Sequence, residues 1–195
     1  MNDIRWDWGL FEMLNFDGPA WLDSAMIAVS GIKMWIPLYI LIIYIVWRRY
    51  GWRGIVALLV AMGVAIGISD IVAGIFKHQG VFANLLPDFP ARLRPMHSEG
   101  LDFAANGYYT GYVNGTVSAH TATIVAIAMI SIYGVRRMWF TLAMSVIALL
   151  ICYSRIYLAC HFPQDILLGM CVGVVAGLCG ILLFKSVIKL TTKKQ

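Results

Sequence analysis

Charged residues are scarce in this sequence. Asp, Glu, Lys and Arg make up 13% of it, against about 25% in typical soluble domains, while 61% of the residues are hydrophobic. This composition excludes an ordinary soluble domain, and several apolar runs approach the roughly 20 residues that a helix needs to cross a membrane. We therefore expect a single membrane-embedded domain over residues 1–195.

Cysteine is also rare. The four cysteines, Cys152, Cys160, Cys171 and Cys179, lie in or beside apolar runs and lack the spacing of metal ligands. We expect them to behave as small hydrophobic residues of helices, and we predict no disulfide, no metal and no other cofactor.

Acidic residues are fewer than basic ones, which gives a formal net charge of +5. The basic residues flank apolar segments, as is typical of the cytoplasmic ends of membrane helices, so no nucleic-acid partner is needed to explain them. They form three clusters: Arg48, Arg49 and Arg53; Arg136 and Arg137; and Lys185, Lys189, Lys193 and Lys194.

The apolar segments predict an all-α integral membrane protein with about six transmembrane helices in one bundle. A short interfacial helix near Trp8 to Leu14 would precede them and end at the Asp17-Gly18-Pro19 turn. The predicted spans are 20–31, 32–47, 55–76, 117–133, 138–157 and 163–184, and the polar stretch 78–116 is the predicted outer loop.

The three basic clusters agree on one orientation. If they face the cytoplasm, the opposite helix ends and the long loop lie outside, which predicts a multi-pass protein of a bacterial-type inner (plasma) membrane with its site facing the periplasm or exterior. The residues gathered at that outer face would be Lys77, Arg92, Arg94, His120, Arg155 and His161.

One pair at this face has the pattern of an oriented histidine. His161 lies just before Pro163, which is favoured in the first turn of a helix, and Asp165 follows four residues after the histidine. A carboxylate that accepts the N–H of one imidazole nitrogen raises the nucleophilicity of the other. The pattern therefore predicts an activated His161.

A second histidine opens the span that begins near residue 117. His120 follows Ser118 and Ala119, where the unpaired N–H groups of a helix N-terminus suit a phosphate. Lys77, Arg94 and Arg155 would add cations, and Arg matches phosphate oxygens with its planar fork. Together these residues predict phosphoryl transfer without a metal ion.

Simpler interpretations exist for each residue alone. A single interfacial Arg more often extends to lipid headgroups, and a lone loop histidine is more often solvated, which is the interpretation for His78 and His97. Asp70 is as well explained by pairing with a neighbouring helix as by a role in the site. The combined spacing favours the site.

Three stretches resemble the signatures of the type 2 phosphatidic acid phosphatase family. Ser154 to Asp165 is similar to SRxxxxxHxxxD at every defined position, Val117 to His120 resembles PSGH, and Lys77 with Arg94-Pro95 resembles KxxxxxxRP. The resemblance implies a six-helix membrane domain with His161 as nucleophile, Asp165 as its orienting partner and His120 as the acid for the leaving alkoxide. The residues implied to bind the phosphoryl group are Lys77, Arg94, Ser118, the Ala119 amide and Arg155.

The sequence departs from these signatures in two places. Val117 and Ala119 replace Pro and Gly, and sixteen residues separate Lys77 from Arg94, so a segment such as 80–90 must loop out. Arg92 is an alternative cation to Lys77.

The favoured function is hydrolysis of a phosphate monoester or diphosphate on a membrane lipid through a phosphohistidine. Candidate substrates are undecaprenyl diphosphate, lipid A phosphate, phosphatidylglycerol phosphate and phosphatidic acid; the sequence does not choose among them, nor does it predict an oligomeric state. The main alternative is a non-catalytic lipid-headgroup binder or transporter that uses the same basic pocket. A serine protease using Ser118 lacks a nucleophile-elbow pattern, and haloperoxidases with a similar site are soluble.

Overall fold

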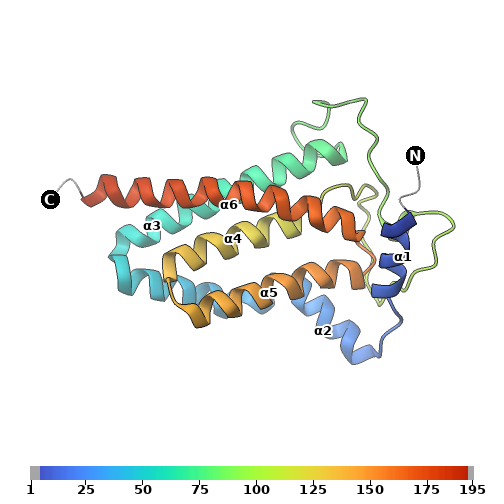
Figure 1. Cartoon of the computed structure of the whole chain (residues 1–195), viewed down its shortest axis with the longest axis horizontal. Helices are drawn as coiled ribbons and strands as arrows, with labels where there is room; N and C mark the ends of the chain where they lie inside the picture. The colour runs from blue at the N-terminus through green and yellow to red at the C-terminus, as the bar shows by residue number, and fades with distance from the viewer. Residues whose placement is uncertain (1–4, 193–195) are drawn as a thin grey trace.

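The computed structural model describes residues 5–192, so Lys193 and Lys194 of the third basic cluster lie outside the described part. Every regular element in this range is helical, which confirms the all-α prediction (Figure 1). In chain order the elements are α1 (Arg5–Leu14), α2 (Ala20–Ser30), the 3-10 turn η1 (Lys33–Trp35), α3 (Ile36–Lys77), the 3-10 turn η2 (Pro95–His97), α4 (Ala119–Val135), α5 (Met138–Tyr157) and α6 (Pro163–Thr192).

Three of the described helices are long and apolar enough to cross a membrane. They cover Lys33–Lys77, Met138–Tyr157 and Pro163–Thr191, whereas α2 and α4 are shorter apolar helices. Large apolar side chains are exposed on these helices, as expected where lipid replaces water. The chain is therefore an integral membrane protein.

The spans expected at 32–47 and 55–76 correspond to the two helical arms of α3. The arms meet at Gly51, which is non-helical, with φ 65° and ψ −161°. Only glycine adopts this conformation without strain, so Gly51 lets the chain reverse between two helical arms. Figure 1 shows the two arms diverging from this turn, with α4 lying close to both.

Glycines on α6 bring it into close contact with α4. A Cβ at Gly169 would lie 2.6 Å from the carbonyl oxygen of Ser118, and one at Gly173 would lie 2.6 Å from that of Ala122. Small residues allow this approach, because packing rather than hydrophobic burial drives helix association in lipid. The contact fixes the start of α6, which follows His161, against the start of α4, which carries His120.

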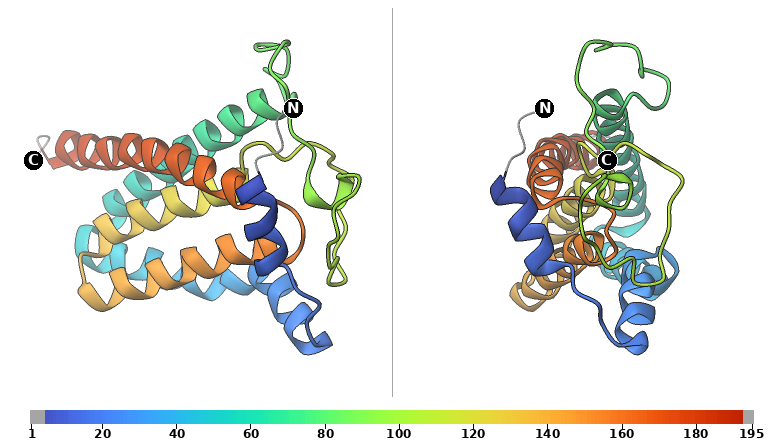
Figure 2. Two further views of the ribbon diagram at one scale, coloured as in Figure 1. Left: turned by 45° about the vertical axis from the view of Figure 1, so that its right-hand side comes forward. Right: turned by 90° about the vertical axis from the view of Figure 1, so that its right-hand side faces the viewer.

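The two ends of the bundle differ in character. The Gly51 turn, the α4–α5 connection and the end of α6 lie together at one end, and the basic clusters, as far as they fall within residues 5–192, belong to these segments (Figure 1). At the other end lie α1, the irregular stretch between α3 and α4, and the α5–α6 connection. Figure 2 shows α1 lying across this second end, where it contacts α5 and α6.

The long stretch between α3 and α4 is closed by a few local contacts. The insertion after Lys77 loops away from the bundle, and it closes where Nε2 of His78 meets the carbonyl oxygen of Phe89 at 2.7 Å. The chain then returns through an isolated bridge between Leu93 and Asn114. His78 is thus held by the loop, so the prediction that it is merely solvated was wrong.

Candidate active site at the outer end of the bundle

His161 lies in the short connection between α5 and α6 and is almost completely buried. Its Nδ1 lies 3.4 Å from Oδ2 of Asp165, which also accepts the backbone N–H of Phe162 at 3.1 Å. Because Nδ1 faces the carboxylate, Nε2 is the nitrogen available to the site, and it lies 3.5 Å from Nη1 of Arg94. The imidazole of His161 therefore has Nδ1 facing the carboxylate of Asp165 and Nε2 facing the guanidinium of Arg94.

Three basic side chains, including that of Arg94, lie around this histidine. Lys77 ends α3, Arg94 lies in the irregular stretch between α3 and α4, and Arg155 lies in the last turn of α5. Their exposed fractions are only 5%, 6% and 3%. No carboxylate in residues 5–192 lies within ion-pair distance of any of the three. Buried cations without a counter-ion are costly, so this arrangement favours a bound anion.

The two guanidinium groups retain unused donors. Nη1 of Arg94 donates to the carbonyl oxygen of Cys160 at 3.2 Å, and Nη1 of Arg155 bonds Oγ of Ser30. The Nε atoms of both arginines are buried without a partner in the described part of the chain. Buried donors of this kind are nearly always paired, which again points to an oxyanion.

Burial lowers the pKa of His161 well below its usual range, and the nearby charges of Lys77, Arg94 and Arg155 lower it further. The imidazole is therefore neutral near pH 7, as a nucleophile requires. The start of α4, which carries His120, and the α5–α6 connection, which carries His161, lie at the same end of the bundle (Figure 1).

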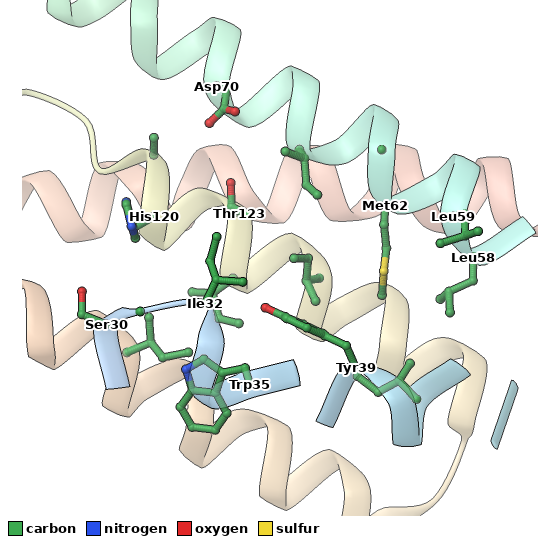
Figure 3. Close-up of a pocket in the computed structure, with 18 of the residues that line it drawn as sticks. Ser30, Ile32, Trp35, Tyr39, Leu58, Leu59, Met62, Asp70, His120 and Thr123 are labelled. Carbon is green, nitrogen blue, oxygen red and sulfur yellow. The ribbon is translucent and has the colours of Figure 1, made fainter. Parts of the chain in front are cut away.

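The start of α4 supplies the second histidine. Ser118 is the N-cap, and its Oγ accepts the N–H of Thr121 at 3.3 Å, while its own N–H donates to the carbonyl oxygen of Asp165 at 3.1 Å. Ser118 is completely buried in this role, which counts against an exposed serine nucleophile. His120 is exposed, and Figure 3 shows its imidazole at one end of a cavity.

This cavity of about 610 Å³ leads away from His120 between the two arms of α3 and α4. Ser30, Asp70 and Thr123 line the end near His120, and the hydroxyl of Tyr39 faces the cavity further along (Figure 3). The rest is lined mainly by apolar side chains, including those of Ile42, Leu58, Met62 and Ile124. Asp70 lines this cavity and forms no ion pair within residues 5–192.

Arg92 lies beside this cluster with a different set of contacts. Its guanidinium pairs with Asp7 of α1 and lies 3.6 Å from the ring centroid of Phe162. The structure therefore places Lys77, and not Arg92, among the cations without a counter-ion. His97 is also not merely solvated, because its Nε2 lies 3.0 Å from the carbonyl oxygen of Thr110.

Several residues at the site carry no sequence signal. Asn114 donates to the carbonyl oxygen of Lys77 at 3.0 Å, and the ring of Tyr108 lies 5.5 Å from the guanidinium carbon of Arg155. A Cβ at Gly115 would lie 3.1 Å from Cγ of Arg94 and 3.2 Å from Oδ2 of Asp165. These contacts join residues far apart in the chain, so no local pattern reveals them.

A membrane-embedded helical bundle with an oriented, neutral histidine among buried cations defines a class, the integral membrane phosphatases. The match to a family is direct: the family model described as the PAP2 superfamily matches residues 56–189. The chain belongs to the PAP2 superfamily and is a membrane lipid phosphatase, which confirms the resemblance seen in the signatures.

Curated relatives and solved structures agree with this assignment. The chain is 30% identical to a lipid A 4'-phosphatase of Bacteroides thetaiotaomicron over 94% of this chain and 78% of the relative, and 26% identical to one of Porphyromonas gingivalis over 86% and 68%. The crystal structure of Aquifex aeolicus LpxE is similar, with a TM-score of 0.64 and 22% identity over 91% of this chain and 93% of that one. So is a PAP2-type phosphatidylglycerolphosphate phosphatase of Bacillus subtilis, with a TM-score of 0.60 and 21% identity over 100% and 89%. The two structures support the shared fold.

Proposed function

We propose that this lipid phosphatase hydrolyses a phosphate monoester on the saccharide headgroup of lipid A. The reaction needs no metal ion and passes through a phosphohistidine at His161. The observation that carries the chemistry is the set of buried cations, Lys77, Arg94 and Arg155, which lack a counter-ion beside a neutral imidazole. The substrate rests on the two relatives named lipid A 4'-phosphatases, which match most of the chain.

The geometry supports a two-step reaction. Nε2 of His161 attacks phosphorus, the bond from phosphorus to the sugar oxygen breaks, and His120 donates a proton to that leaving oxygen. Water then attacks the phosphohistidine, His120 takes the proton of that water, and phosphate leaves as Nε2 is restored. Throughout the reaction, Asp165 accepts a hydrogen bond from Nδ1–H of His161, and the proton stays on Nδ1.

The cations take the place that a metal ion has in other phosphoryl-transfer sites. Lys77, Arg94 and Arg155 would neutralise the charge on the equatorial oxygens, together with the hydroxyl of Ser118 and the N–H of Ala119 at the start of α4. The unpaired Nε atoms of Arg94 and Arg155 are donors of the kind that this role needs.

The cavity supports a lipid substrate. Its polar outer end next to His120 suits a headgroup, and its apolar remainder between the α3 arms suits an acyl chain. In a membrane, six spans would be formed by α2, the two arms of α3, α4, α5 and α6 in one domain. The basic end would face the cytoplasm and the site the periplasm of an inner membrane.

The test measures phosphate release from purified lipids in detergent with EDTA present. The panel is lipid A, undecaprenyl diphosphate, phosphatidylglycerol phosphate and phosphatidic acid. We expect the highest kcat/KM on lipid A, and we expect His161→Ala to reduce release to background because the nucleophile is gone. His78→Asn is the matched control, since Asn tolerates the positive φ of 55° at this position.

The outcome also separates the alternatives. An acid-labile phosphate trapped on the parent protein but not on His161→Ala supports the covalent step. Tight lipid binding with no phosphate release by the parent favours the headgroup binder, and a faster reaction on another lipid of the panel overturns the lipid A assignment alone.

A further inference from the structure

A buried carboxylate on α1 ties three distant segments together. Asp7 is completely buried, although α1 lies across the outer end of the bundle. Its Oδ2 pairs with Nη1 of Arg92, and its Oδ1 accepts the backbone N–H of Gln164 at 2.9 Å. The contact with Arg92 is an ion pair, and charge-assisted hydrogen bonds are about twice as strong as neutral ones.

The same segments enclose the ring next to the proposed nucleophile. Phe162, which follows His161, is completely buried. The guanidinium carbon of Arg92 lies 3.6 Å from its centroid, and the rings of Trp8 and Phe11 lie at 6.1 Å and 5.3 Å from it. Phe162 is thus held between α1 and the outer stretch.

Asp7 takes the place of an N-cap side chain at the start of α6. The helix begins at Pro163, which has no N–H, and the preceding Phe162 has no side-chain acceptor. The N–H of Gln164 would otherwise be one of the unpaired donors of a helix N-terminus. Asp7 supplies the acceptor from another element, and its negative charge complements the helix dipole.

We propose that Asp7 and Arg92 are positioning residues for the phosphatase reaction: they fix the start of α6 and thereby aim Nε2 of His161 at the phosphorus atom. This inference rests on the proposed function, since it assigns no new activity. The segment from Leu158 to Phe162 is irregular. The backbone N–H of His161 donates to the carbonyl oxygen of Arg155 at 3.2 Å, and Nδ1 of its imidazole faces Asp165 at 3.4 Å, a long contact that a small shift of α6 breaks. Misplacing a reacting group by about 1 Å costs about 100-fold in rate.

The experiment uses the full-length protein in detergent and single turnovers on lipid A. The variants are Asp7→Ala, Arg92→Ala, the double variant and Arg92→Lys. Arg92→Lys keeps the charge opposite Asp7 but loses the planar contact with Phe162, so it serves where a larger change prevents folding. Glu12→Ala is the matched control, because Glu12 is an exposed acid on the same helix.

We expect the rate constant for phosphate release to fall about 10- to 100-fold in both alanine variants, with an unchanged amplitude per protein. The double variant should be no slower than either single variant, because the two residues act as one unit. A merely structural role would reduce the amplitude and leave the rate constant intact.

Rate constants within about twofold of the parent in Asp7→Ala or Arg92→Ala overturn the inference, because losses of about 10- to 100-fold are expected of a misplaced reacting group. Where neither alanine variant folds, the same result in Arg92→Lys overturns it, since this variant loses the planar contact with Phe162. If these variants are unchanged while the parent releases phosphate and His161→Ala does not, the proposed function stands and the positioning role alone is wrong. A parent without activity on any lipid of the panel overturns both.

Discussion

At the scale of single residues, the environment of His161 sets when the site can react. After burial, the charge of Lys77 contributes most to lowering the pKa of His161. A lowered pKa keeps the imidazole neutral down to a lower pH, so the acid side of the kcat/KM profile should fall off below the ordinary histidine value of about 6.5.

Lys77→Met should move the acid limb of the kcat/KM profile, where activity falls as the pH is lowered, to higher pH. Removing the positive charge removes one cause of the lowered pKa, so His161 becomes protonated at a higher pH than in the parent. The overall rate should also fall because a phosphate ligand is lost. The measurement is kcat/KM from about pH 4 to about pH 8 on one lipid.

Lys77→Arg is the control for this prediction, since it keeps the charge and should leave the limb in place. The phosphate monoester itself titrates near a pKa of about 6, but it does so equally for every variant. A limb at the same pH in Lys77→Met and Lys77→Arg would show that Lys77 does not act on His161.

The residues of the site differ in how far the sequence could predict them. His161 and Asp165 are four residues apart and contact each other within one short segment, so their spacing alone indicates the pair. The sequence spacing could not decide whether Lys77 or Arg92 is the phosphate-binding cation. The sequence lacks any sign of the partner Asp7, which lies eighty-five positions from Arg92 in the chain.

At the scale of helices, close packing of α6 on α4 depends on glycine. Gly173→Ala should lower the stability of the protein, because the added Cβ would lie 2.6 Å from the carbonyl oxygen of Ala122 and 2.8 Å from Cβ of Val125. Overpacking of this kind costs about 1–3 kcal/mol, or about 2–10 °C in Tm for a chain of this size. Thermal unfolding in detergent measures the change.

Gly67→Ala is the matched control. It is the same substitution inside α3, and a Cβ at Gly67 would meet no heavy atom within 4 Å. Alanine is also favoured over glycine in helices by about 1 kcal/mol, so the Tm should stay the same or rise. Equal losses in the two variants would mean that the α4–α6 contact does not limit stability.

The helices also show what hydropathy patterns capture and what they miss. Apolar runs predicted α5 with its observed bounds, but α6 continues to Thr192 although the run ends near Phe184. Lys185 and Lys189 are good helix formers, so the helix continues after hydrophobicity declines. The path of residues 78–118 was beyond prediction, because contacts such as the Leu93–Asn114 bridge are set by tertiary structure.

At the scale of the whole molecule, the basic clusters and the proposed catalytic site lie at opposite ends of the bundle. The basic clusters within residues 5–192 belong to the Gly51 turn, the α4–α5 connection and the end of α6, whereas the cluster around His161 lies at the other end (Figure 1). The sequence predicted this division because each basic cluster follows or precedes an apolar run, and successive spans must alternate in direction.

This arrangement predicts which side of the membrane each end reaches. Cysteines introduced one at a time at Glu99 and Met138, both exposed and at opposite ends, should differ in their reaction with a membrane-impermeant maleimide on intact spheroplasts. Glu99→Cys should be labelled from outside, because basic residues at the other end favour a cytoplasmic location for that end. Met138→Cys should be labelled only after lysis, and the native cysteines serve as the background in the parent protein. Labelling of Met138→Cys from outside would reverse the orientation and place the phosphatase site in the cytoplasm.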